Sequence, residues 1–123
     1  MATKSEELKQ LRKICLKLPE ATEVEAWGSP TFRVRKKMFA TYAEPENNHG
    51  DHVAGVWCKG TIENQEMLVA SNPRRYFVPP YVGVKGWVGM RLNGKVSWKD
   101  VEELVTDAYR LLAGKRLLAE LDG

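Results

Sequence analysis

The sequence has little cysteine or histidine, and it lacks the motifs that mark several common enzyme classes. Its 123 residues include two cysteines, Cys15 and Cys58, and two histidines, His49 and His52. No CxxC pair, GxSxG nucleophile elbow or GxxxxGK[ST] phosphate-binding loop occurs. The histidines lie in a polar loop with Asp51, without the i, i+4 helical spacing of an HExxH zinc site. We therefore expect a solvated loop there, and we expect no metal, no cofactor and no enzymatic activity.

Long apolar runs are also missing. No segment approaches the roughly 20 apolar residues that span a bilayer, and the first ten residues, MATKSEELKQ, lack the apolar core of a secretion signal. We expect no membrane partner and a cytoplasmic location. In such a reducing compartment, Cys15 on the apolar side of a helix and Cys58 at the end of a strand are expected to be small core residues.

The overall composition is that of one globular domain. Hydrophobic residues make up 43% of the chain and charged residues 28%, which argues against disorder. A length of 123 residues suits a single domain over residues 1–123. The net charge of +3, from 19 basic and 16 acidic residues, permits nucleic-acid binding without requiring it.

Three stretches have the periodicity of helices. The first has apolar residues at helical spacing over 8–18 and is stopped by Pro19. The second is shorter, over about 61–71, with Thr61 as its cap. The third has a wide apolar stripe over 98–112 behind a Ser97 cap, and Gly114 ends it before a short apolar segment. The inward-facing residues of the second helix are then Ile62, Met67 and Leu68.

Extended segments with turn signals occupy the rest of the chain. Alternation or β-forming composition predicts strands over about 27–34, 38–42, 52–59, 75–78 and 86–92. The acidic residues Glu20, Glu23 and Glu25 are interpreted as a solvated approach to the first strand rather than as a catalytic pair. Strands joined by hairpins indicate an antiparallel sheet. The expected fold is α+β, with an antiparallel sheet of about five or six strands and helices packed on one face, in two layers.

The densest group of cations lies at the end of the first predicted hairpin. It consists of Arg33, Arg35, Lys36 and Lys37. Alternation places both arginines on one strand face, with the lysines at the tip. Such a tip can enter a nucleic-acid groove and release counterions from phosphate. A charged edge that prevents aggregation explains the same residues equally well.

A second group of cations and aromatic residues surrounds Pro79 and Pro80. It consists of Arg74, Arg75, Lys85, Trp87 and Arg91. If Val88, Met90 and Leu92 face the core, Trp87 and Arg91 lie on the opposite sheet face. Trp87 can then stack on a base, which is worth roughly 1–3 kcal/mol. Alternatively, Trp87 packs beneath a loop or against Tyr81, as large aromatic residues usually do.

Three phrases, in this order and spacing, resemble a known family. They are LPEATEVEAWGSPTFRVRKKMFATY, KGWVGMRL and VSWKDVEELVTDAYRLLAGK. Over about Leu8 to Leu118 the chain resembles the MmcQ/YjbR proteins. The resemblance implies a double-wing fold, like that of the C-terminal domain of the phage transcription factor MotA, and it implies the family's label of DNA-binding protein. The two basic hairpins would be the wings, and no catalytic residue set is implied.

Two functions follow as hypotheses. The first is a bacterial-type DNA-binding protein that contacts phosphates through both basic hairpins, with Trp87 stacking. The second is a binding module for a small ligand or a protein partner, which uses an aromatic surface around Tyr76, Tyr81 and Trp87. Binding that weakens steeply with salt would distinguish the first from the second. The oligomeric state does not follow from the sequence.

Overall fold

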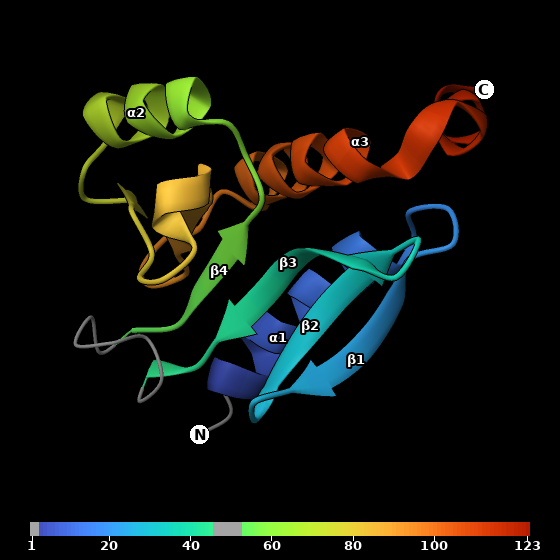
Figure 1. Ribbon diagram of the computed structural model, residues 1–123. Coiled ribbons are helices and arrows are strands. Elements are labelled where there is room, and N and C mark those ends of the chain that lie inside the picture. Colours follow the sequence, from blue (N-terminus) through green and yellow to red (C-terminus); the bar gives the residue numbers. More distant parts are fainter. Residues whose placement is uncertain (1–2, 46–52) are drawn as a thin grey trace.

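The computed structural model describes residues 3–45 and 53–123, and over these residues it contains one antiparallel sheet and three α-helices (Figure 1). The helices are α1 (Thr3–Leu16), α2 (Ile62–Ser71) and α3 (Trp98–Asp122), and a short 3-10 helix is η2 (Gly83–Lys85). The strands are β1 (Thr22–Ala26), β2 (Ser29–Val34), β3 (Lys37–Ala43), β4 (Gly55–Cys58), β5 (Tyr76–Phe77) and β6 (Val88–Arg91). They lie in the order β1-β2-β3-β4-β6-β5. The predicted α+β class, with five or six strands, is confirmed. None of the helices in the described ranges is long and apolar enough to cross a membrane.

Helices α1 and α3 cover one face of the sheet. Figure 1 shows α1 behind β1, β2 and β3, and α3 contacts β2, β3 and β4. Alternation explains this arrangement, since Phe32, Val56 and Met90 all point to the helices and are buried. The rings of Phe39 and Tyr109 meet edge to face, with their centroids 5.7 Å apart. The core therefore lies between this sheet face and the two helices.

Local signals in the sequence fix the helix ends as predicted. The Thr61 hydroxyl accepts a hydrogen bond from the backbone N–H of Asn64 at 3.1 Å, at the start of α2. Ser97 accepts one from Asp100 at 3.3 Å, at the start of α3. Gly114 has φ 85°, and it breaks α3 into a long and a short segment. Both cysteines are buried and unbridged, which confirms their prediction as core residues.

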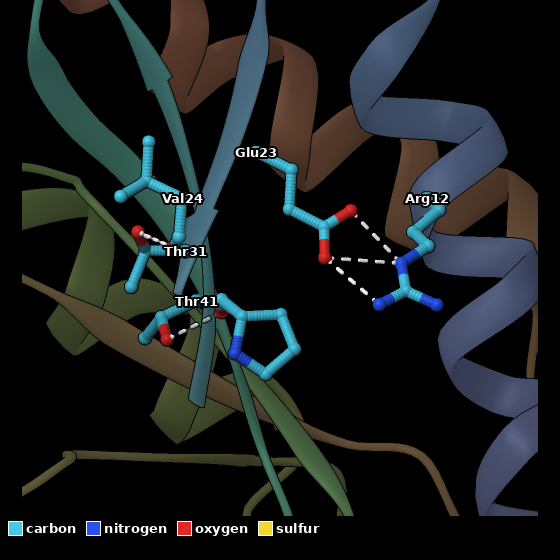
Figure 2. Close-up of polar contacts among 6 residues, drawn as sticks. Arg12, Glu23, Val24, Thr31 and Thr41 are labelled. Carbon is cyan, nitrogen blue, oxygen red and sulfur yellow. Dashed lines mark hydrogen bonds and ion pairs between the residues drawn. The ribbon is translucent and has the colours of Figure 1, made fainter. Parts of the chain in front are cut away.

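Two predictions of local structure were wrong. The acidic approach to the first strand is itself a strand, β1. Its Glu23 faces α1 and pairs with Arg12 at 2.8 Å, whereas Glu25 is exposed as predicted (Figure 2). In α2, Ile62 and Met67 are exposed and the buried residue is Gln65, whereas Leu68 packs against the core as predicted. In both places a polar side chain occupies the inward position, so that hydrophobic periodicity did not reveal it.

Candidate ligand-binding cavity

A cavity of about 610 Å³ lies on the sheet face opposite α1 and α3, and we call it the aromatic cavity. The sheet contributes its base and one side, and the connection 78–87 between β5 and β6 contributes the other side. The residues that line it are Ala26, Trp27, Ser29, Thr31, Met38, Thr41, Trp57, Pro80, Tyr81, Val82 and Trp87. The same alternation that sends Phe32, Val56 and Val88 to the helices sends Thr31, Trp57 and Trp87 to the cavity.

The connection 78–87 folds compactly rather than extending into solvent. Pro79 and Pro80 start it, and their carbonyl groups accept hydrogen bonds from the backbone N–H groups of Gly83 and Val82. Gly86 has φ 99°, and a Cβ atom there would lie 2.6 Å from the carbonyl oxygen of Gly60. Only glycine allows this close approach of the two backbones. The connection is thereby held against the start of α2.

Gln65 of α2 is hydrogen-bonded to the same connection. Its Nε2 atom donates to the carbonyl oxygens of Gly83 at 2.7 Å and of Trp87 at 2.6 Å, and the side chain is buried. These two bonds use both amide protons of Gln65. They join α2 to two carbonyl groups of the connection, one of which, that of Gly83, also accepts from the backbone N–H of Gly86. The segment that contains Tyr81 and Trp87 is therefore held in place by hydrogen bonds to α2.

Two aromatic residues at the cavity edge are exposed and have an unusual backbone. Trp27 is 88% exposed with φ 54°, and Tyr81 is 79% exposed with φ 67°. Bulky residues in this left-handed region are strained, typically by about 1–3 kcal/mol. Trp27 and Gly28 form the two-residue turn between β1 and β2, where both φ angles are positive. Asn-Gly is the favoured pair in such a turn, so Trp27 makes this turn less stable than asparagine would.

Two further tryptophans that line the cavity, Trp57 and Trp87, are less exposed than Trp27. Trp87 is 5% exposed and Trp57 is half-buried, and both line the cavity beside Met38. The aromatic cavity therefore has three tryptophans and one tyrosine among its lining residues. None of its lining residues carries a charge at neutral pH. Such a surface favours an apolar, flat molecule.

Two threonine hydroxyls supply polar atoms in the base of the cavity. Thr31 and Thr41 are directly opposite each other on β2 and β3. The Thr31 hydroxyl donates to the carbonyl oxygen of Val24, and the Thr41 hydroxyl donates to that of Pro30 at 2.9 Å (Figure 2). Arg33 donates from Nε to the Thr31 hydroxyl oxygen at 3.1 Å. Both hydroxyl groups are thus fixed in orientation before any ligand arrives.

Comparison with known proteins identifies the family and the fold of the chain. A model of the YjbR family matches residues 16–111, most of the chain. The chain belongs to the YjbR family. A Deinococcus radiodurans crystal structure with a DUF419 domain superposes with a TM-score of 0.72, at 23% identity, over 94% of this chain and 87% of that chain. A Pseudomonas syringae protein gives 0.69 at 18% identity, over 84% and 96%. These likenesses establish the fold, and no curated protein matches.

The first basic group of this YjbR chain does not lie on one face. Arg33 reaches Thr31 on the cavity side, whereas the guanidinium of Arg35 lies 2.9 Å from where a Cβ of Gly114 in α3 would be. The prediction that both arginines share a strand face was wrong, because Arg35 lies in the turn with φ 53° rather than in the strand. Lys36 and Lys37 are exposed.

The second basic group is divided between the two ends of the sheet. Lys85 lies in the connection 78–87, before the start of β6. Arg74 and Arg75 precede β5, and Arg91 ends β6, so these three lie at the other end. The nine residues predicted to bind nucleic acid therefore do not form a single cluster.

Arg75 and Arg91 bind the protein's own backbone. Arg75 donates to the carbonyl oxygens of Arg91, Asn93 and Lys95. Arg91 donates to those of Pro73 and Arg74, both at 3.1 Å, and its guanidinium lies 4.8 Å from the centre of the Phe77 ring. These contacts join the chain before β5 to the end of β6, so the two side chains have structural partners.

The predicted aromatic surface is only partly assembled. Tyr81 and Trp87 meet in the cavity, but Tyr76 pairs in register with Met90 and packs against the core on the helix side. Burial raises the pKa of Tyr76, and the acidic residues of α3 add to this effect. Trp27 and Trp57 were missed, although the alternation of Val56, Trp57 and Cys58 held the signal for Trp57. The predicted loop around His49 and His52 lies outside the described residues. Within those residues no cluster of three metal-ligating side chains occurs.

Proposed function

We propose that this YjbR-family chain is a binding module for a compact, mainly apolar small molecule, held in the aromatic cavity. The observation that carries the proposal is the pair of exposed aromatic residues, Trp27 and Tyr81, at strained backbone positions on the edge of the cavity. Strain of this kind is concentrated at functional sites. The side chain of Trp27 buries little apolar surface in the fold, because it is 88% exposed.

The size and rigidity of the cavity support the same proposal. Its volume of about 610 Å³ lies within the usual range for small-molecule sites, about 300–1,000 Å³. The hydrogen bonds of Gln65 hold the connection 78–87 in place. A site that is already formed loses less conformational entropy on binding. The proposal describes a binding protein rather than an enzyme.

A neutral dye that fluoresces in apolar surroundings, N-phenyl-1-naphthylamine, tests this function. We expect saturable binding at one site per chain. Tyr81→Ala should weaken it about tenfold, because the lost ring contact is worth roughly 1–2 kcal/mol. Val84→Ala is the matched control, since Val84 is 83% exposed in the same connection but does not line the cavity. An equal effect of both variants, or no saturable binding, would refute the proposal.

DNA binding is a second candidate, and one observation favours it. Lys36 and Lys37 are exposed next to each other at the turn between β2 and β3. They could contact neighbouring phosphates, with Arg33, Arg35, Arg74, Arg75, Lys85, Arg91 and Trp87 as the remaining members of the predicted interface. Binding to duplex DNA should then weaken steeply with salt.

The double variant Lys36→Glu/Lys37→Glu separates the two candidates. For DNA binding we expect a large loss of affinity and a smaller dependence on salt. For the cavity we expect unchanged binding of N-phenyl-1-naphthylamine, because neither lysine lines it. DNA binding that is absent, or insensitive to salt, would remove the second candidate.

A further inference from the structure

We infer that the ligand of the aromatic cavity is a neutral, planar ring compound that donates an N–H hydrogen bond to the threonine hydroxyls of its base. The inference rests on the proposed function and specifies the chemistry of the ligand. It follows from which hydrogen-bonding capacity of Thr31 and Thr41 is already used. A hydroxyl group has one proton to donate and two lone pairs that accept.

The Thr41 hydroxyl has no proton left for a ligand. Its proton is donated to the carbonyl oxygen of Pro30, 2.9 Å away. That bond is internal to the sheet, since Pro30 belongs to the neighbouring strand β2. Thr41 lines the cavity, and its lone pairs are its remaining capacity. A ligand group that meets this oxygen must therefore be a donor.

Thr31 has the same polarity. Its hydroxyl proton is donated to the carbonyl oxygen of Val24, and one lone pair accepts from Nε of Arg33. One lone pair remains. Because Thr31 and Thr41 are opposite each other in register, their side chains are neighbours in the base of the cavity. A ligand that placed a carbonyl or ether oxygen there would leave its own acceptor facing two others.

The charge of the surroundings favours a neutral donor over a cation. Aromatic faces attract organic cations, but the lining residues include no carboxylate that could balance one. The guanidinium of Arg33 also lies next to Thr31, with Nε 3.1 Å from its hydroxyl oxygen. A cation would lose its hydration and meet a like charge. A neutral N–H on an aromatic ring avoids both costs.

A matched pair of ring compounds tests the inference on the unmodified protein. Indole carries an N–H group, whereas 1-benzothiophene has a similar shape and no donor. We expect indole to bind about three- to tenfold more tightly, the factor that corresponds to one neutral hydrogen bond. Chemical-shift titration of the backbone amides measures both affinities and locates both ligands.

Variants of Thr41 assign the effect to this hydroxyl. Thr41→Val should remove the preference for indole, whereas Thr41→Ser should retain it. Equal affinities for the two compounds in the unmodified protein would overturn the inference while leaving the cavity as a binding site. A lack of binding by both compounds, and by N-phenyl-1-naphthylamine, would instead refute the proposed function.

Discussion

At Trp27 the requirements of turn stability and of the proposed ligand binding differ. It occupies the first position of a two-residue turn with φ 54°, beside Gly28 with φ 78°. A β-hairpin prefers asparagine followed by glycine in this turn, because both residues tolerate the left-handed region. Trp27 lines the cavity, and its exposed indole is available to contact a ligand.

Trp27→Asn should therefore stabilise the protein and impair the site. We expect the free energy of unfolding to rise by about 1 kcal/mol, because the strain at this position is relieved. The affinity for N-phenyl-1-naphthylamine should fall several-fold. Arg35→Asn is the control, since Arg35 has φ 53° in the turn between β2 and β3 and does not line the cavity. It should stabilise the protein without changing dye binding. Unchanged dye binding in Trp27→Asn would show that the indole is not part of the site.

Gly89 is required by a close contact within the sheet. A Cβ atom at this position would lie 2.3 Å from Cζ of Phe77, on the neighbouring strand β5. We expect Gly89→Ala to lower the free energy of unfolding by about 2 kcal/mol, because the added methyl group has no space. Urea denaturation measures this change. The same substitution in a Phe77→Leu background should cost less, and an equal cost in both backgrounds would contradict this explanation.

At the scale of elements, α2 holds the connection beside the cavity through Gln65, while Leu68 and Val69 pack against the core. Its buried residue is Gln65, whereas Ile62 and Met67 are exposed. The helix contacts β5 and β6. Its position is thus linked to the connection 78–87, which carries Tyr81 and Trp87.

Gln65→Leu should loosen this connection. The substitution removes both hydrogen bonds that join α2 to the carbonyl groups of Gly83 and Trp87, at a cost of about 2 kcal/mol. We expect faster hydrogen exchange at the amides of residues 82–87 and weaker dye binding. Glu66→Leu, at the exposed neighbouring position of α2, should leave both unchanged. Exchange that stays slow in Gln65→Leu would show that α2 does not brace the site.

The edge strand β1 shows why one element escaped sequence analysis. Three of its five residues are exposed and two are half-buried, and the inward position opposite Phe32 is Glu23. A strand is recognised by apolar residues at every second position. Here an ion pair with Arg12 replaces apolar contact at that position, so the pattern that revealed β2 and β3 was absent.

At the scale of the whole molecule, the two thiols report on the integrity of the core. Cys15 of α1 and Cys58 of β4 are both fully buried. Burial raises the pKa of each thiol well above the ordinary value of 9.0. The folded protein therefore holds both as neutral thiols, while the unfolded chain can ionise them.

This difference predicts a loss of stability in alkali. A folded pKa above the unfolded one means that the stability is fully present below about pH 9 and decreases as the pH rises beyond it, by about 1.4 kcal/mol per pH unit for each thiol. Urea denaturation between pH 8 and pH 10.5 measures the slope. The variant Cys15→Ala/Cys58→Ala should have a smaller slope, and an identical slope would contradict the assignment. In the folded protein at pH 8, Ellman's reagent should react no faster than global unfolding allows.

The sequence by itself determined the elements that depend on neighbours along the chain. Caps at Thr61 and Ser97, the break at Gly114, and the alternation that separates Phe32 and Val34 from Thr31 are local effects of hydrogen bonding and side-chain direction. Together with the hairpins they determine the α+β class, because each apolar face must be covered.

Only the tertiary structure decided where the proposed binding surface lies. Trp27, Trp57 and the pair Tyr81 and Trp87 come from three separate segments, and the pairing of strands and the folding of residues 78–87 bring them together. Alternation tells which face a side chain is on, but not which distant residue lies beside it. The same holds for the cations, which are close in sequence and separate in space because a turn and carbonyl contacts direct Arg35, Arg75 and Arg91 to different partners.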